Sequence, residues 1–105
     1  LGAQGTLLAE GGQPKNDWQL WGGPLTAGCV AALLINGRAE PRVLSVPWEQ
    51  LGIAAGRPMD VFDLWRAGTR IATGSVDTVE MSASGGNDCA FYRLCPAARS
   101  YLEGA

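Results

Sequence analysis

Histidine is absent from this sequence of 105 residues, and lysine occurs once, at Lys15. Without histidine the chain can form neither a Ser-His-Asp triad nor a Cys-His pair, and imidazole cannot act as a metal ligand. The cysteines are unclustered and do not match zinc spacing, so no cofactor or metal is predicted. The net charge is −2 with scattered charges, which argues against nucleic-acid binding because that requires several phosphate contacts.

Long hydrophobic segments are also missing. The longest apolar run, residues 29–35, is far shorter than the ~20 residues that span a bilayer, so no membrane segment is predicted. At 105 residues the chain is one domain, too short for a (β/α)8 barrel of about 200 residues or more. It begins at Leu1 with neither an initiator methionine nor a signal peptide, which favours a processed or excised fragment.

What the sequence does contain is a series of short apolar segments separated by glycine, proline and asparagine. Residues 29–35 predict a central strand buried on both faces, with a short buried helix as the alternative. About seven to nine strands at intervals of ~8–12 residues predict an all-β antiparallel β-sandwich with Greek-key-type connections. We expect this domain to cover residues 1–96, with residues 97–105 as a flexible tail.

Turn residues predict where several of these segments end. Residues 22–24 (GGP) should stop the strand that begins at Trp18, because proline cannot donate to a strand ladder. Residues 47–51 suit a single helical turn that ends at Gly52. Residues 59–65 predict a strand, and its broken alternation indicates a bulge near Asp63.

The three cysteines leave more than one arrangement open. If residues 89–95 form one strand, Cys89 and Cys95 lie about 20 Å apart and cannot bridge each other. Cys29 could pair with either of them across neighbouring strands. Alternatively, all three are small buried hydrophobic residues, so the redox compartment is left open.

Six segments, each a weak match alone, together form a more specific pattern. The segments are residues 1–5 (LGAQG), 20–26 (LWGGPLT), 30–36 (VAALLIN), 46–52 (VPWEQLG), 61–65 (VFDLW) and 85–94 (GGNDCAFYRL). In order and spacing they resemble the C-terminal β-domain of the α-galactosidases of glycoside hydrolase family 27.

The resemblance implies a non-catalytic sandwich that packs on and stabilises a catalytic (β/α)8 barrel absent from this chain. The whole enzyme would remove terminal α-linked galactose by retaining hydrolysis, with two carboxyl groups about 5–5.5 Å apart on the barrel. No residue of this chain matches either group, so no catalytic residue is carried over. The family also implies a secreted, vacuolar or lysosomal location. The alternative is a stand-alone carbohydrate- or protein-binding module in a larger assembly.

The carboxylates within the chain predict no catalytic pair. Asp60 and Asp63 would point to opposite faces of a strand, as would Asp77 and Glu80, so we expect solvated charges. Asp63 is the partial exception, since its carboxylate suits a structural hydrogen bond to a neighbouring turn. The glycines at residues 22–23 and 85–86 lack the strand-to-helix context of a phosphate loop.

The four tryptophans remain as candidates for a binding surface. Trp48 and Trp65 are expected in the core because their neighbours are apolar. Trp18 and Trp21 should lie on opposite faces of one strand, so one of them is predicted to face outward. Its role could be to contact the missing barrel, to pack in the core or to stack on a sugar ring.

Overall fold

The computed structural model describes residues 5–11, 17–75, 77–83 and 88–97. Eight strands, one helical turn and two 3-10 turns make up this part of the chain. In chain order they are β1 (Thr6–Gly11), β2 (Trp18–Pro24), η1 (Thr26–Gly28), β3 (Val30–Asn36), β4 (Arg42–Pro47), α1 (Trp48–Leu51), β5 (Met59–Asp63), η2 (Leu64–Arg66), β6 (Thr69–Ser75), β7 (Thr78–Ala83) and β8 (Cys89–Pro96).

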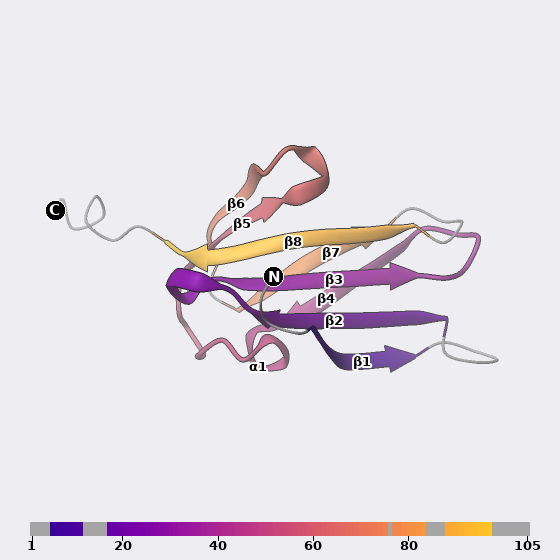
Figure 1. Cartoon of the computed structure of the whole chain (residues 1–105), viewed down its shortest axis with the longest axis horizontal. Helices are drawn as coiled ribbons and strands as arrows, with labels where there is room; N and C mark the ends of the chain where they lie inside the picture. The colour runs from indigo at the N-terminus through magenta and orange to yellow at the C-terminus, as the bar shows by residue number, and fades with distance from the viewer. Residues whose placement is uncertain (1–4, 12–16, 76, 84–87, 98–105) are drawn as a thin grey trace, which may run out of the picture.

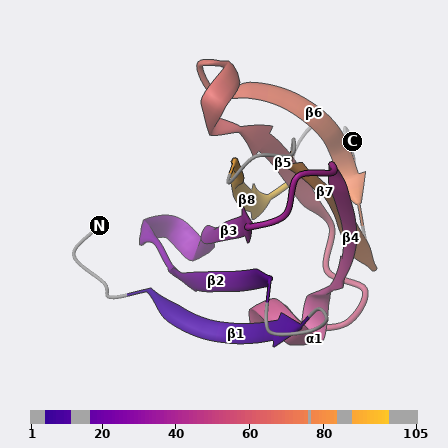
Figure 2. The same ribbon diagram turned by 90° about the vertical axis from the view of Figure 1, so that its right-hand side faces the viewer.

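The strands form two layers, and every pairing is antiparallel. Six of them lie in one sheet in the order β1-β2-β3-β8-β5-β6, and β4 pairs with β7 in a second sheet. Viewed end-on, the large sheet curves, and β4 and β7 lie on its concave side (Figure 2). Strand β8, the last in sequence, lies between β3 and β5, as a Greek-key-type connection requires (Figure 1). The predicted all-β antiparallel sandwich is therefore confirmed.

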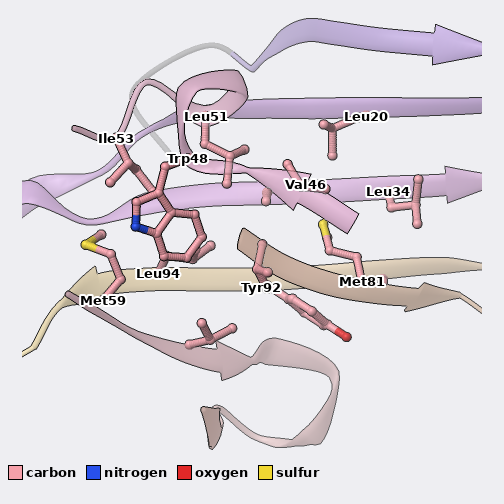
Figure 3. Close-up of a cluster of buried hydrophobic side chains, with 14 of the residues drawn as sticks. Leu20, Leu34, Val46, Trp48, Leu51, Ile53, Met59, Met81, Tyr92 and Leu94 are labelled. Carbon is pink, nitrogen blue, oxygen red and sulfur yellow. The ribbon is translucent and has the colours of Figure 1, made fainter. Parts of the chain in front are cut away.

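The core lies between the two sheets and follows the period-2 alternation of the strands. Strand β7 alternates strictly, with its odd-numbered residues buried and its even-numbered residues exposed. The largest fully buried side chains come from both sheets, and Trp48 and Leu51 of α1 close one end of the cluster (Figure 3). The indole of Trp48 donates to the carbonyl of Arg57 at 2.9 Å, so its buried N–H is satisfied.

Strand β3 departs from one expectation. It is a strand as predicted, but its outer face is covered only in part. Ala32 and Leu34 are completely buried against the second sheet, whereas Leu33 and Ile35 on the other face are only half-buried. A continuous apolar run predicts burial on both faces, yet the β4–β7 sheet covers one face alone.

The predicted stop at residues 22–24 is confirmed at Pro24, but Gly22 and Gly23 belong to the strand. These residues continue β2 in register with the first three residues of β3, and Pro24 is the last residue of the strand. Gly22 belongs there for a steric reason. A Cβ atom on it would lie 2.7 Å from Leu8 Cδ1 and 3.1 Å from the carbonyl oxygen of Ala31. Close packing of β1, β2 and β3 therefore favours glycine within the strand, although the sequence predicted that the strand stops there.

The two other turn predictions fared differently. The helical turn is confirmed as α1, preceded by Pro47 and ended by Gly52, whose φ of 75° is left-handed. The strand predicted over residues 59–65 is shorter, because β5 ends at Asp63 and the chain enters η2. The register shifts in β5 fall between Met59 and Phe62, just before the predicted bulge at Asp63.

A disulfide joins Cys29 to Cys95, with Cα atoms 4.1 Å apart. This is one of the pairings that the sequence left open, and the alternative of three buried free cysteines is wrong. Cys89 is the free cysteine and lies with Cys95 on one strand, β8, as anticipated. Since Val30 pairs with Leu94, the disulfide extends the β3–β8 register by one further residue pair.

The predicted boundary between domain and tail falls at the edge of the described residues. Ala97 is buried, and its amide donates to the carbonyl of Pro58 at 3.0 Å. Residues 98–105 lie outside the described part, so the tail stays a prediction. Within the described residues, no helix has the length and hydrophobicity to cross a bilayer.

We expect replacement of both Cys29 and Cys95 by alanine to lower the free energy of unfolding. A crosslink between residues 66 apart removes loop entropy from the unfolded chain, which corresponds to about 4 kcal/mol. Urea denaturation of the double variant measures the loss, and Cys89→Ser is the matched control. A double variant as stable as the wild-type protein would contradict the bridge.

Neighbouring leucines on β3 test the difference between its two faces. Leu34→Ala should lower the free energy of unfolding by about 2–5 kcal/mol, because it opens a cavity in a fully buried site. Leu33→Ala should lower it by about 1 kcal/mol, since that side chain is only half-buried. Equal losses in urea denaturation would mean that both faces are covered.

Candidate functional site

The carboxylates at residues 60 and 63 bind separate parts of the local fold. The expectation of a solvated charge is wrong for Asp60, which is buried because it accepts a hydrogen bond from the amide of Gly74 in β6 at 2.9 Å and lies 3.6 Å from the guanidinium of Arg70. Asp63 accepts from the amide of Trp65 at 3.0 Å and caps η2. The predicted hydrogen bond of Asp63 to a neighbouring turn is therefore confirmed. Both carboxylates are committed to the local fold rather than to a shared reaction centre.

The other two carboxylates considered as a pair, Asp77 and Glu80, are solvated as expected. Asp77 and Glu80 are exposed, and Glu80 lies opposite Ser45 on the outer side of the small sheet. No group of three or more potential metal ligands occurs in the described ranges. The chemistry available at these positions is that of ordinary surface charge.

The tryptophans separate into core and surface. Trp48 is in the core as predicted, but Trp65 is not, since 60% of its surface is exposed. The reason is local, because the Asp63 cap turns the chain into η2 and swings the ring away from the core. Trp65 Nε1 donates to the carbonyl of Cys89 at 3.0 Å, and its ring lies 5.7 Å from that of Phe91. Both contacts fix the exposed ring.

Trp18 and Trp21 lie on opposite faces of β2, as predicted, because the β2–β3 register is continuous. Trp18 packs against the core, and the guanidinium of Arg42 lies 5.8 Å from its ring centroid. Trp21 lies on the convex face, and its indole N–H donates to the side chain of Gln19 at 3.0 Å. Trp21 is thus the outward residue that the spacing anticipated.

A row of apolar side chains crosses the convex face of the large sheet. Leu7 pairs with Trp21, Trp21 with Leu33 and Leu33 with Phe91, so one side chain from each of four adjacent strands lines up. Trp65 extends the row past Phe91. We call these five residues the outer apolar row. Three of them, Trp21, Leu33 and Phe91, border a hollow of about 130 Å³ that is also lined by Gly5, Gly22, Gly23 and Ala31.

The outer apolar row was not predicted as a unit, although the sequence contained a signal for it. Residues 30–35 are apolar at every position, whereas a strand with one solvated face alternates. Such a run indicates that both faces meet apolar surroundings, but a single strand cannot reveal which neighbours supply them. Phe91 becomes part of the row only through the register of β8 on β3.

Arg93 lies beside this row, two residues after Phe91 on β8. It pairs with Phe62 on β5, and its guanidinium lies 4.6 Å from the centroid of that ring. Its Nη1 also approaches Sγ of Cys95 at 3.5 Å. Among the described residues, no carboxylate lies within ion-pair distance of Arg93, although Asp60 is on the adjacent strand.

Sequence comparisons place the chain among α-galactosidase-related domains. A family model described as the alpha galactosidase C-terminal beta sandwich domain matches residues 15–94. An α-galactosidase of Cyamopsis tetragonoloba is 28% identical over 96 residues, and α-galactosidase 3 of Arabidopsis thaliana is 30% identical over 106 residues. These alignments cover 91% and 98% of this chain but only 22% and 23% of the relatives.

Solved structures show the same fold at lower identity. The α-galactosidase I of Mortierella vinacea matches with a TM-score of 0.75 and 15% identity, over 90% of this chain and 23% of that one. A GH27 β-L-arabinopyranosidase of Geobacillus stearothermophilus matches with a TM-score of 0.72 and 21% identity, over 90% and 20%. The chain therefore spans about a fifth of the length of these proteins.

Substitutions at Asp63 separate a structural role from a chemical one. Asp63→Ala should lower the free energy of unfolding by about 1 kcal/mol, because it removes the cap of η2. Asp63→Asn keeps a capping oxygen and loses only the charge pair with Arg66, whose side chain is 72% exposed. That variant should stay within about 0.5 kcal/mol of wild type. An Asn variant as unstable as the Ala variant in urea denaturation would contradict the capping role.

Proposed function

Since the chain belongs to the family of alpha galactosidase C-terminal beta sandwich domains, we propose that it packs on and stabilises a catalytic (β/α)8 barrel. In this role it is the non-catalytic part of an α-galactosidase-like glycoside hydrolase. The whole protein would remove terminal α-linked galactose from oligosaccharides or glycoconjugates.

The observation that carries this proposal is the extent of the matches. The family match spans residues 15–94, while the chain corresponds to only 22% of the Cyamopsis tetragonoloba α-galactosidase. A (β/α)8 barrel of about 250 residues fits within the remaining length of such a relative. A catalytic unit and this sandwich are therefore expected to occur together.

The chemistry of the described residues supports a non-catalytic role. Retaining hydrolysis requires two carboxyl groups about 5–5.5 Å apart, one as the nucleophile and one as the acid/base. Asp60 binds the amide of Gly74 in β6, Asp63 caps η2, and they are paired with Arg70 and Arg66. Freeing either carboxylate for reaction would break the hydrogen bond that it accepts.

The disulfide supports a location in an oxidising compartment. Disulfides persist in secreted proteins and are rare where cellular thiols keep cysteines reduced. The bridge between Cys29 and Cys95 is therefore compatible with the secreted, vacuolar or lysosomal location that the family resemblance implies.

Two measurements test the proposal. The coding sequence upstream of Leu1 should encode alternating strands and helices, with two carboxylates at the ends of barrel strands. The purified 105-residue chain should show no hydrolysis of an aryl α-galactoside above the buffer background, while the protein that includes the barrel hydrolyses it.

Two results would contradict the proposal. Turnover by the purified 105-residue chain, retained through further purification, would place catalysis within the sandwich. An unrelated domain or a linker upstream of Leu1 would instead favour the stand-alone binding module. A glycan array and co-purification would then identify its ligand.

A further inference from the structure

Among the described residues, the outer apolar row lies on a sheet face that no second sheet covers. The small sheet lies on the concave side of the large sheet (Figure 2), whereas Trp21, Leu33 and Phe91 alternate along their strands with the residues that face the core. Trp65 is 60% exposed and Leu7 is 38% exposed, and both are large hydrophobic residues. A contiguous apolar patch next to polar residues is typical of a protein–protein contact surface.

The row is also rigid, which distinguishes it from scattered exposed hydrophobic residues. Three of its members lie at the centre of the sheet on β2, β3 and β8, where each strand has a neighbour on both sides. The indoles of Trp21 and Trp65 are each held by an intramolecular hydrogen bond. Rigid aromatic side chains lose little entropy on binding, which is why they often dominate interface energy.

The hydrogen bonding of these indoles argues against a sugar as the occupant. Sugar hydroxyls need donors and acceptors, but both indole N–H groups already donate to Gln19 Oε1 and to the carbonyl of Cys89. The side chains that line the hollow are apolar. An apolar protein surface satisfies such a site without leaving polar groups unpaired.

Arg93 indicates which charge a partner on this face should carry. Its guanidinium stacks on Phe62 beside the row and has no carboxylate within ion-pair distance among the described residues. The nearby carboxylate of Asp60 is already bound to Gly74 and Arg70. Covering this face would desolvate Arg93, and an unpaired buried charge is costly, so a carboxylate on the partner is the group that would match it best.

The position of Gly5 suits a domain that precedes this one in the chain. Gly5 lines the same hollow as Trp21, Leu33 and Phe91. If a barrel precedes the sandwich, as in the proposed function, the connection enters the sandwich at the edge of the outer apolar row. A partner joined through this connection is placed directly against the convex face.

We propose that the convex face, centred on Trp21, Leu33 and Phe91, is the surface on which the catalytic barrel docks. The barrel would meet it with an apolar surface that carries a carboxylate opposite Arg93. This assignment rests on the proposed function and deepens it, because it specifies which face is covered and what chemistry covers it.

Hydroxyl-radical footprinting tests the face. The 105-residue chain is compared with the protein in which it follows the barrel, and the oxidation rate of each side chain is measured by mass spectrometry. Oxidation of Trp65 and Phe91 should fall about fivefold or more in the longer protein, because an interface core excludes water. Val43 on β4, which is 63% exposed, is the internal control and should not change.

The charge is tested in the longer protein with two substitutions. Arg93→Glu should reduce the protection of Trp65 to less than about twofold, because it opposes a carboxylate with a carboxylate. Arg93→Met keeps much of the stacking on Phe62 and should retain more protection. The difference in Trp65 protection between these two variants should become smaller when the salt concentration is raised from about 50 mM to about 500 mM. Arg38→Glu is the matched control, since Arg38 binds backbone carbonyls between β3 and β4.

Each alternative outcome has a distinct meaning. Protection of Val43 instead of Trp65 would overturn the face but leave barrel docking intact. Protection of neither residue would also overturn the face, while the proposed function is decided separately by the sequence upstream of Leu1 and by the hydrolysis assay. If the protection of Trp65 in the 105-residue chain rises with protein concentration, the face binds a second copy of the chain. If protection occurs only after sugar is added, the face binds a glycan. If R93E and R93M reduce the protection of Trp65 equally at all salt concentrations, the proposed carboxylate opposite Arg93 is contradicted.

Discussion

The pairing of β3 with β8 is the interaction on which the rest of the structure depends. The two strands lie far apart in the sequence, yet they align without a bulge. Their pairing joins the β1–β2–β3 meander to the β5–β6 hairpin, so the six-stranded sheet cannot form without it. Such a non-local pairing is opposed by loop-closure entropy. The disulfide between Cys29 and Cys95 links the strands at the end of this pairing and reduces that entropic opposition.

The same register gives the two faces of the sheet their separate roles. Leu34 pairs with Ala90 toward the core, and Leu33 pairs with Phe91 toward the convex face. A slip of one residue would exchange the two sets of side chains. Because β3 is apolar throughout, the register that builds the core also places an apolar row on the outside. The core and the proposed docking face are therefore two consequences of one pairing.

The sequence predicted those features that depend on local signals. The number of strands followed from the turn spacing, and α1 followed from Pro47 and Gly52. Features that depend on distant neighbours could not be predicted in this way. Gly22 fits the strand because a Cβ atom there would crowd Leu8 and the carbonyl oxygen of Ala31, and only the packing of β1 and β3 on β2 reveals this. Trp65 was assigned to the core from its apolar neighbours, whereas its cap directs it outward. The outer apolar row combines four strands, so it becomes visible only once their registers are known.

The exposed row also explains why stability and docking should be linked in this domain. A domain of 105 residues buries a modest fraction of its surface, so its net stability is a small difference between large terms. A partner that binds only the folded form adds its binding free energy to that stability. The faces of β3 and β8 that would receive the partner belong to the strand pair that holds the sheet together. Docking would therefore stabilise the β3–β8 pairing, which loop-closure entropy opposes. In this way a domain without reacting groups of its own would make a catalytic neighbour and itself more resistant to unfolding.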